Sequence, residues 1–266
     1  MTFQALTIAG SDSGGGAGIQ ADLKTFSALG VYGASAITAI TAQNTQGVFA
    51  VEAVSPSMIA SQIQAVFADL NISAIKVGML GDVPAIEAVA GLLLATGIPL
   101  VVDPVMVAKS GDLLLPASAV DALRQLLLPK AFLLTPNLPE AAHLLGVEVA
   151  QTPEQMEEQG KALIDLGAQA VLMKGGHGKS AVCTDVLVLP NRVEIFEVER
   201  QLTTNLHGTG CTFAAAITAN LAKGLNLVAA VEQAHDYLQN AIFAGSAAGF
   251  QVGRGQGPVH HFYQQW

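Results

Sequence analysis

Charged residues are scarce in this chain of 266 residues, since Lys and Arg number 12 and Asp and Glu 21, or 12% of the sequence. Soluble domains typically carry about twice that share, and the mean hydropathy is +0.47. A membrane span is still not expected, because the longest uncharged stretch, residues 25–51, is rich in Ser, Thr, Asn, Gln and Gly, whereas a spanning helix needs about 20 mostly apolar residues. The N-terminus also lacks the basic residues and cleavage site of a signal peptide. We expect a soluble protein.

Positive charge and cysteine are also in short supply. The net charge is −9 and no segment clusters Lys or Arg, which disfavours binding to nucleic acid or to an anionic membrane. The two cysteines, Cys183 and Cys211, stand in no Cys-x-x-Cys or Cys/His metal pattern, which argues against a disulfide scaffold or a structural zinc site. The cysteine content fits a reducing, cytoplasmic setting, and the absence of basic clusters fits a small-molecule ligand.

Short apolar runs alternate with longer segments of helical period. Because the runs are continuously apolar, both faces of their sheet should be covered by helices. The pattern predicts an α/β fold with a doubly wound, mostly parallel sheet and a hairpin at one edge, in a single domain over residues 1–266. The expected strands are 5–9, 34–39, 74–77, 100–103, 132–135 and 170–174, the hairpin is 180–187 with 192–199, and the expected helices include 58–70, 85–95, one with a capping box starting at Thr152-Pro153, 211–221 and 227–247.

A Gly-rich segment, residues 10–18, lies between the first strand and a helix, where ligands gather in open α/β sheets. It is no Walker A loop, because no Gly-Lys-Ser/Thr follows. Gly16, Gly18 and Ala21 form a degenerate dinucleotide fingerprint, but no acidic residue between Asp22 and Glu52 could hold a ribose hydroxyl. A dinucleotide-dependent oxidoreductase is therefore disfavoured. Five glycines here still suggest that the backbone approaches a ligand or another strand closely.

A second Gly-rich segment, residues 207–212, leads into an Ala-rich helix. Free backbone N–H groups and the positive end of the helix dipole would favour a phosphate or a developing oxyanion there. We expect the same position to lower the pKa of Cys211. The alternative is that Cys211 is a small buried apolar residue and that Gly208 and Gly210 only serve the turn.

Polar residues also stand where buried strands end. Asn137 and Glu140 share one face of a first helical turn and could reach a metal-bound water, for which Mg²⁺ is well suited. The alternative is a capping box in which Asn137 is the N-cap. Lys174 and Asp103 each end a strand expected to be buried. Convergence of these groups at one sheet edge favours a functional site.

Together these motifs resemble the bacterial hydroxymethylpyrimidine/phosphomethylpyrimidine kinases of thiamine biosynthesis, members of the ribokinase-like family. The resemblance covers nearly the whole chain and rests on residues 5–25, 41–45, 77–80, 103–112, 135–140, 173–177, 207–212 and 257–262. It implies a ribokinase-like fold, phosphorylation by ATP of the pyrimidine's hydroxymethyl group and then of the monophosphate, Mg²⁺, and a homodimer.

The resemblance also implies roles for individual residues. The pyrimidine pocket would be formed by Gly10, Asp22, Gln43, Met79 and Val105. Mg²⁺ and the nucleotide phosphates would be held by Asn137, Glu140, Asp103, Thr209 and Lys174. The anion hole would run from Gly208 through Gly210 to Cys211, with Lys174 beside it. Gln43 suits a 4-aminopyrimidine because an amide both donates and accepts.

Cys211 stands where most sugar kinases of this family carry an aspartate base, and it could replace that base only with a pKa near neutrality. Residues 107–115 resemble a flap that excludes water. Two departures from the family pattern bear on nucleotide affinity. Thr204 and Leu206 stand in a segment where the family commonly reads Thr-Lys-Asn-Thr, and the loop after Gly176 is short, with Lys179 as a partial substitute for the missing cation.

Two further functions compete with this one. A pyridoxal kinase of the same family would phosphorylate a similar hydroxymethylated ring, and dual activity is compatible with the sequence. A non-catalytic sensor of small molecules would keep the pyrimidine pocket but would not need Asn137, Glu140, Lys174 and Cys211 together.

Overall fold

The computed structural model describes residues 2–93, 97–106, 116–177, 180–247 and 249–266. In these ranges the chain forms one sheet with the strand order β3-β2-β1-β4-β5-β6-β7-β8-β9. Neighbouring strands from β2 through β1 and β4 to β7 run parallel, whereas β3, β8 and β9 pair antiparallel with their neighbours. The strands are β1 Gln4–Asp12, β2 Tyr32–Asn44, β3 Gly47–Ala53, β4 Ala74–Val77, β5 Leu100–Val102, β6 Leu133–Leu134, β7 Val171–Met173, β8 Val182–Leu189 and β9 Arg192–Glu199.

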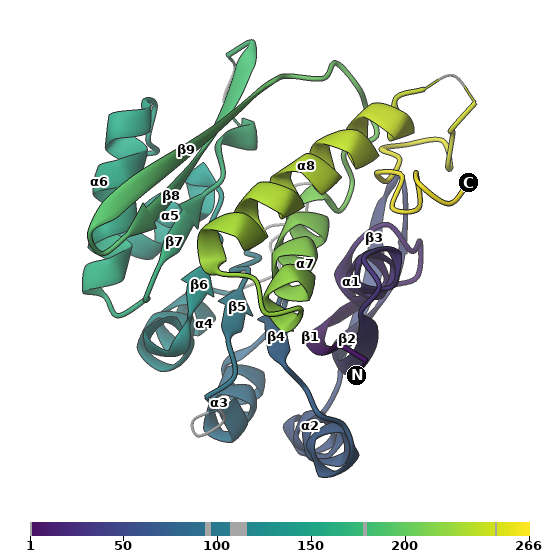
Figure 1. Ribbon diagram of the computed structural model, residues 1–266. Coiled ribbons are helices and arrows are strands. Elements are labelled where there is room, and N and C mark those ends of the chain that lie inside the picture. The colour runs from purple at the N-terminus through teal and green to yellow at the C-terminus, as the bar shows by residue number, and fades with distance from the viewer. Residues whose placement is uncertain (1, 94–96, 107–115, 178–179, 248) are drawn as a thin grey trace.

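Helices cover both faces of the sheet (Figure 1). On β6, Leu133 packs into the core shared with α1, α7 and α8, while Leu134 packs into the core shared with α2 to α6. This alternation confirms the doubly wound, mostly parallel sheet that the sequence predicts. The helices are α1 Gly18–Ala28, α2 Pro56–Asp69, α3 Val83–Leu93, α4 Ala117–Ala122, α5 Leu138–Leu145, α6 Pro153–Asp165, α7 Thr209–Ala222 and α8 Leu227–Gly245, with shorter turns η1 Leu123–Leu127, η2 Leu128–Lys130 and η3 Gly175–His177.

Most helix starts follow local chemistry in the sequence. The Ser55 side chain caps α2 and Pro56 opens it, where the missing proline N–H costs nothing. Thr152 caps α6 by accepting from Gln155, but the Gln155 side chain accepts from Gln151 rather than closing the expected capping box. The described residues contain no helix long and apolar enough to cross a membrane.

The predicted edge hairpin is β8–β9. A second hairpin, β2–β3, occupies the opposite edge and was not expected. β2 is longer than the predicted strand because it continues to Asn44, and β3 is mostly exposed. An exposed edge strand does not give the continuous apolar run by which the central strands are found.

Candidate active site

A cavity of about 1240 Å³ lies where the central parallel strands end. Its walls come from the segments after β1, β2, β4, β5, β6 and β7 and from the start of α7, as expected for a ligand site in an open α/β sheet. All but one of the predicted site residues line it: Gly10, Gln43, Met79, Asp103, Val105, Asn137, Glu140, Lys174, Gly208, Thr209, Gly210 and Cys211.

Asp22 is the exception. Its carboxylate is fully buried below the cavity, where it accepts from the Lys76 ammonium at 2.8 and 2.9 Å and from the Thr7 hydroxyl at 2.6 Å. Lys76 lines the cavity instead. Although burial favours the neutral amine, the Asp22 carboxylate raises the pKa of Lys76 above its ordinary value. In this structure the side chain that meets the cavity is therefore Lys76, the ion-pair partner of Asp22, and a role for Asp22 in the pyrimidine pocket stays a prediction.

Lys174 and Asp103 form an ion pair at the cavity floor. Lys174 Nζ lies 2.7 Å from Asp103 Oδ1, which also accepts from the Thr135 hydroxyl at 3.2 Å. Both charges follow strand ends, Asp103 after β5 and Lys174 after β7. The adjacent carboxylates raise the pKa of Lys174 despite its burial, so the ammonium stays charged at neutral pH. The sequence had placed both residues at one edge without predicting that they pair.

The start of α7 points at this ion pair. Gly208 is its N-cap, with a φ of 76°, and a Cβ there would collide with the carbonyl of Gly16. A Cβ on Gly210 would stand 3.3 Å from Lys174 Nζ. The Thr209 amide donates to the Leu206 carbonyl, which leaves the Gly210 and Cys211 amides as the helix donors that an anion can take.

The pKa of Cys211 is the opposite of what the sequence predicted. Burial raises the pKa of the thiol to about 11, although the Lys76 ammonium lowers it in part. The helix start provides N–H donors, but removal of the thiol from water outweighs them. Cys211 is therefore a thiol at neutral pH rather than a preformed thiolate.

Asn137 and Glu140 form the capping box that was the alternative explanation of their motif, and their role in holding Mg²⁺ stays a prediction. Asn137 Oδ1 accepts from the Glu140 amide at 2.9 Å and Glu140 Oε2 from the Asn137 amide at 2.8 Å, which is a complete capping box on α5. Both residues also line the cavity. Burial raises the pKa of Glu140 to about 7, with Lys174 lowering it and Asp103 raising it further. In the described part of the chain no three His, Cys, Asp or Glu side chains cluster as metal ligands.

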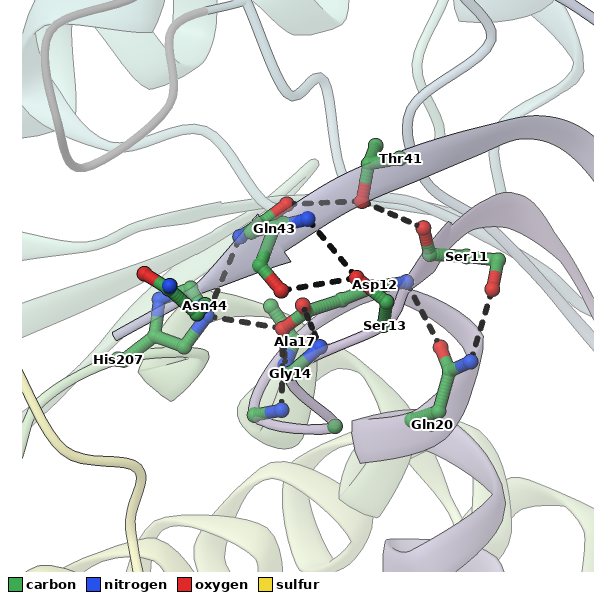
Figure 2. Close-up of polar contacts among 12 residues, drawn as sticks. Ser11, Asp12, Ser13, Gly14, Ala17, Gln20, Thr41, Gln43, Asn44 and His207 are labelled. Carbon is green, nitrogen blue, oxygen red and sulfur yellow. Dashed lines mark hydrogen bonds and ion pairs between the residues drawn. The ribbon is translucent and has the colours of Figure 1, made fainter. Parts of the chain in front are cut away.

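The Gly-rich segment of residues 10–18 wraps an internal carboxylate (Figure 2). Asp12 Oδ1 accepts from the Gly14 amide at 2.8 Å, and Oδ2 accepts from the Gly16 and Ala17 amides at 3.0 and 2.9 Å. His207 Nε2 lies 3.0 Å from the same Oδ2. Although burial opposes it, these hydrogen bonds lower the pKa of Asp12. The glycines thus bring the backbone close to a side chain of this chain, the Asp12 carboxylate.

The sequence reasoning missed several cavity residues. Asp12 and His207 lie inside quoted motifs, so an acidic residue among glycines was the available signal. Arg200, one residue after β9, lines the cavity and donates to the Gly176 carbonyl at 2.8 Å, but a lone arginine after an edge strand carries no such signal in the sequence. The predicted flap, residues 107–115, and Lys179 lie outside the described residues.

The fold and this site define a phosphotransferase of the ribokinase-like class. Over residues 12–260 the sequence matches the phosphomethylpyrimidine kinase family, and the chain belongs to that family. It is 54% identical to the hydroxymethylpyrimidine/phosphomethylpyrimidine kinase of Rhizobium meliloti (strain 1021), over 100% of this chain and 99% of the relative.

Two solved structures place the fold. Phosphomethylpyrimidine kinase from Clostridium difficile 630 has a TM-score of 0.81 and 44% identity, covering 91% of this chain and 100% of that one. Bacillus subtilis pyridoxal kinase, solved as an ADP complex, has a TM-score of 0.91 and 38% identity, covering 100% of this chain and 99% of that one. Proteins with this fold therefore include both a phosphomethylpyrimidine kinase and a pyridoxal kinase.

Proposed function

We propose that this protein uses ATP to phosphorylate 4-amino-5-hydroxymethyl-2-methylpyrimidine and then its monophosphate, giving the diphosphate for thiamine biosynthesis in the cytoplasm. The observation that carries the proposal is that one cavity contains two groups of residues. The first group is the α7 N-terminus with Lys174, and the second is Gln43 with Met79. The first suits a transferring phosphoryl group and the second a planar polar ring. Family membership and the 54% identical kinase support the same conclusion.

Phosphoryl transfer depends mainly on positioning and on stabilising charge on the transferred group. The Gly210 and Cys211 amides and the Lys174 ammonium would hold that charge. Asp103, 2.7 Å from Lys174 Nζ, orients the ammonium. Because Cys211 is protonated at neutral pH, it would have to lose its own proton before it could take the proton of the hydroxymethyl group in the first step, and the charge of Lys76 favours that thiolate form.

The carboxyl groups beside the phosphate site fit a hydrated Mg²⁺. Burial and the charge of Asp103 both disfavour the ionised form of Glu140, and a divalent cation would offset both effects. Mg²⁺ usually keeps water and phosphate oxygens and takes only one or two carboxylates, so a cluster of three protein ligands is not required. When bound, the ion would neutralise charge on the nucleotide phosphates.

The exposed apolar side chains of β3 favour a homodimer at the β2–β3 edge. Phe49 and Val51 are 69% and 51% exposed on the outer strand β3, where a second copy could cover them. Light scattering on wild type and on Phe49→Lys tests this: a dimer that becomes a monomer supports it, and a monomeric wild type refutes it.

Pyridoxal is the second candidate acceptor, favoured by the B. subtilis pyridoxal kinase. Incubation with Mg-ATP and either acceptor, followed by mass spectrometry, separates the two. Formation of the pyrimidine diphosphate supports the main proposal, and pyridoxal phosphate as the sole product would overturn it.

A further inference from the structure

His207 joins the two Gly-rich segments at the side of the cavity assigned to the acceptor ring. Its Nε2 atom lies 3.0 Å from Asp12 Oδ2 and 3.4 Å from Nε2 of the Gln43 carboxamide (Figure 2). The imidazole is held in place because its backbone amide donates to the Gly257 carbonyl at 3.0 Å and its ring packs against Gly16, where a Cβ would collide with it. One imidazole nitrogen therefore faces both a carboxylate and a side chain that lines the cavity.

The Asp12 carboxylate decides where the imidazole carries its hydrogen. Asp12 is 3% exposed, and its lowered pKa keeps it anionic at neutral pH. A carboxylate only accepts hydrogen bonds. A ring nitrogen 3.0 Å from its Oδ2 must therefore carry a hydrogen, whether the imidazole is neutral or charged.

That hydrogen constrains the carboxamide of Gln43. With Nε2–H on His207, a neighbouring amide NH₂ group would place two donors against each other, whereas an amide oxygen could share that one hydrogen with Asp12 Oδ2. At the other end of the carboxamide, Gln43 Oε1 lies 3.1 Å from the Thr41 hydroxyl. This hydroxyl has one hydrogen and is only 2.8 Å from the Ser11 carbonyl, so towards Gln43 it is best used as an acceptor.

Both contacts become favourable if the carboxamide turns by half a rotation about its terminal bond, because this exchanges the oxygen and the nitrogen in place. We propose that His207 is a positioning residue that fixes the Gln43 carboxamide with its oxygen towards the imidazole and its NH₂ group towards Thr41. Asp12 acts behind His207 by fixing the hydrogen on Nε2. The chain Asp12–His207–Gln43–Thr41 thus sets the order of donor and acceptor that Gln43 presents to the cavity.

This order of donor and acceptor on Gln43 determines which acceptor ring the proposed kinase would favour, and the inference therefore rests on the proposed function. Gln43 retains one hydrogen on the Thr41 side and one lone pair on the His207 side for a ligand. A ring with an exocyclic amino group beside a ring nitrogen, the pattern of a 4-aminopyrimidine, pairs with it when its amino group faces the His207 side. A ring that offers no donor at that position leaves the Gln43 oxygen unpaired, which weakens binding.

Steady-state kinetics of two His207 variants test the proposal. His207→Gln keeps an N–H donor near the position of Nε2, and His207→Leu removes it. Loss of one aligned hydrogen bond should raise the KM for the hydroxymethylpyrimidine about tenfold in His207→Leu, with kcat and the KM for ATP nearly unchanged, and His207→Gln should restore most of the loss. A fall in kcat or a rise in the KM for ATP of the same size would instead mean that His207 only supports the α7 anion hole, and it would overturn the proposal.

A double-mutant cycle and NMR keep the outcome independent of folding defects. In a Gln43→Met background, His207→Leu should raise the KM for the pyrimidine no further, whereas a second tenfold loss would show that His207 acts elsewhere. In ¹⁵N-labelled wild type, Nε2 of His207 should be protonated, and the NH₂ protons of Gln43 should show contacts to the Thr41 side chain. An unprotonated Nε2 would refute the proposal even if the enzyme phosphorylates the pyrimidine. If wild type phosphorylates no pyrimidine, the proposed function fails, and the NMR result still decides the carboxamide orientation.

Discussion

Lys76→Met should cost this protein more stability than most single substitutions. The change leaves the Asp22 carboxylate fully buried with the Thr7 hydroxyl as its remaining partner. Removing one partner of a buried ion pair costs about 3–5 kcal/mol, because the other charge stays in the interior uncompensated. For a chain of this length each 1 kcal/mol lowers Tm by about 2–4 °C, so we expect a loss on the order of 10 °C.

The assay is urea and thermal unfolding followed by circular dichroism, without ligand. Asp22→Asn should be destabilised as well, since it leaves the Lys76 ammonium buried. The double variant Asp22→Asn/Lys76→Met carries no charge at this place and should be more stable than Lys76→Met alone. If Lys76→Met unfolds within about 1 kcal/mol of wild type, or if the double variant is no more stable than it, the two residues do not form a buried charged pair and the reasoning fails.

Three further predictions concern the phosphate side of the cavity. Cys211→Ala should slow the first phosphorylation more than the second, because only the first acceptor is a neutral hydroxyl; equal losses in both single-turnover rates would contradict a role in proton removal. Gly210→Ala should reduce kcat by about 100-fold or more, since its Cβ would stand 3.3 Å from Lys174 Nζ. The control is Gly91→Ala inside α3, where no atom lies within 4 Å of the added Cβ. This variant should keep its activity and gain about 0.5–1 kcal/mol in the free energy of unfolding. Burial raises the pKa of Glu140 from 4.5 to about 7, so the folded state binds this proton more tightly than the unfolded chain. The bound proton should therefore contribute about 3 kcal/mol to the free energy of unfolding below pH 4.5, and this contribution should be lost as the pH rises through 7. Urea unfolding from pH 4.5 to 8 should show this slope in wild type and lose it in Glu140→Gln.

The sequence predicts the central sheet and the place of the site because both depend on local patterns. Continuous apolar runs mark strands covered on both faces, and polar residues that end such runs, such as Asp103 and Lys174, must meet at one edge of a parallel sheet. The resemblance to the kinase family adds residue roles, and nearly all of those side chains line the cavity.

What the sequence does not predict depends on contacts between distant segments. Asp22 lies one helical turn inside α1, and only the position of Lys76 on β4 shows that its carboxylate faces an ammonium rather than a ligand. The pKa of Cys211 depends on how fully the fold removes its thiol from water, which the helix start alone does not reveal. The carboxylate inside the first Gly-rich segment is visible in the sequence, but its partner His207 follows almost two hundred residues later.

The contact between the two Gly-rich segments bears on when the enzyme matures during synthesis. A nascent chain that has completed β1 and α1 lacks His207, and the α7 start that leans on Gly16 has not yet been made. The β2–β3 turn gains its last contact later still, because the Thr45 carbonyl accepts from the Gln256 amide at 2.8 Å. The sheet can therefore assemble progressively on the ribosome, while catalytic competence should arise abruptly once the segment around residue 256 has emerged from the exit tunnel.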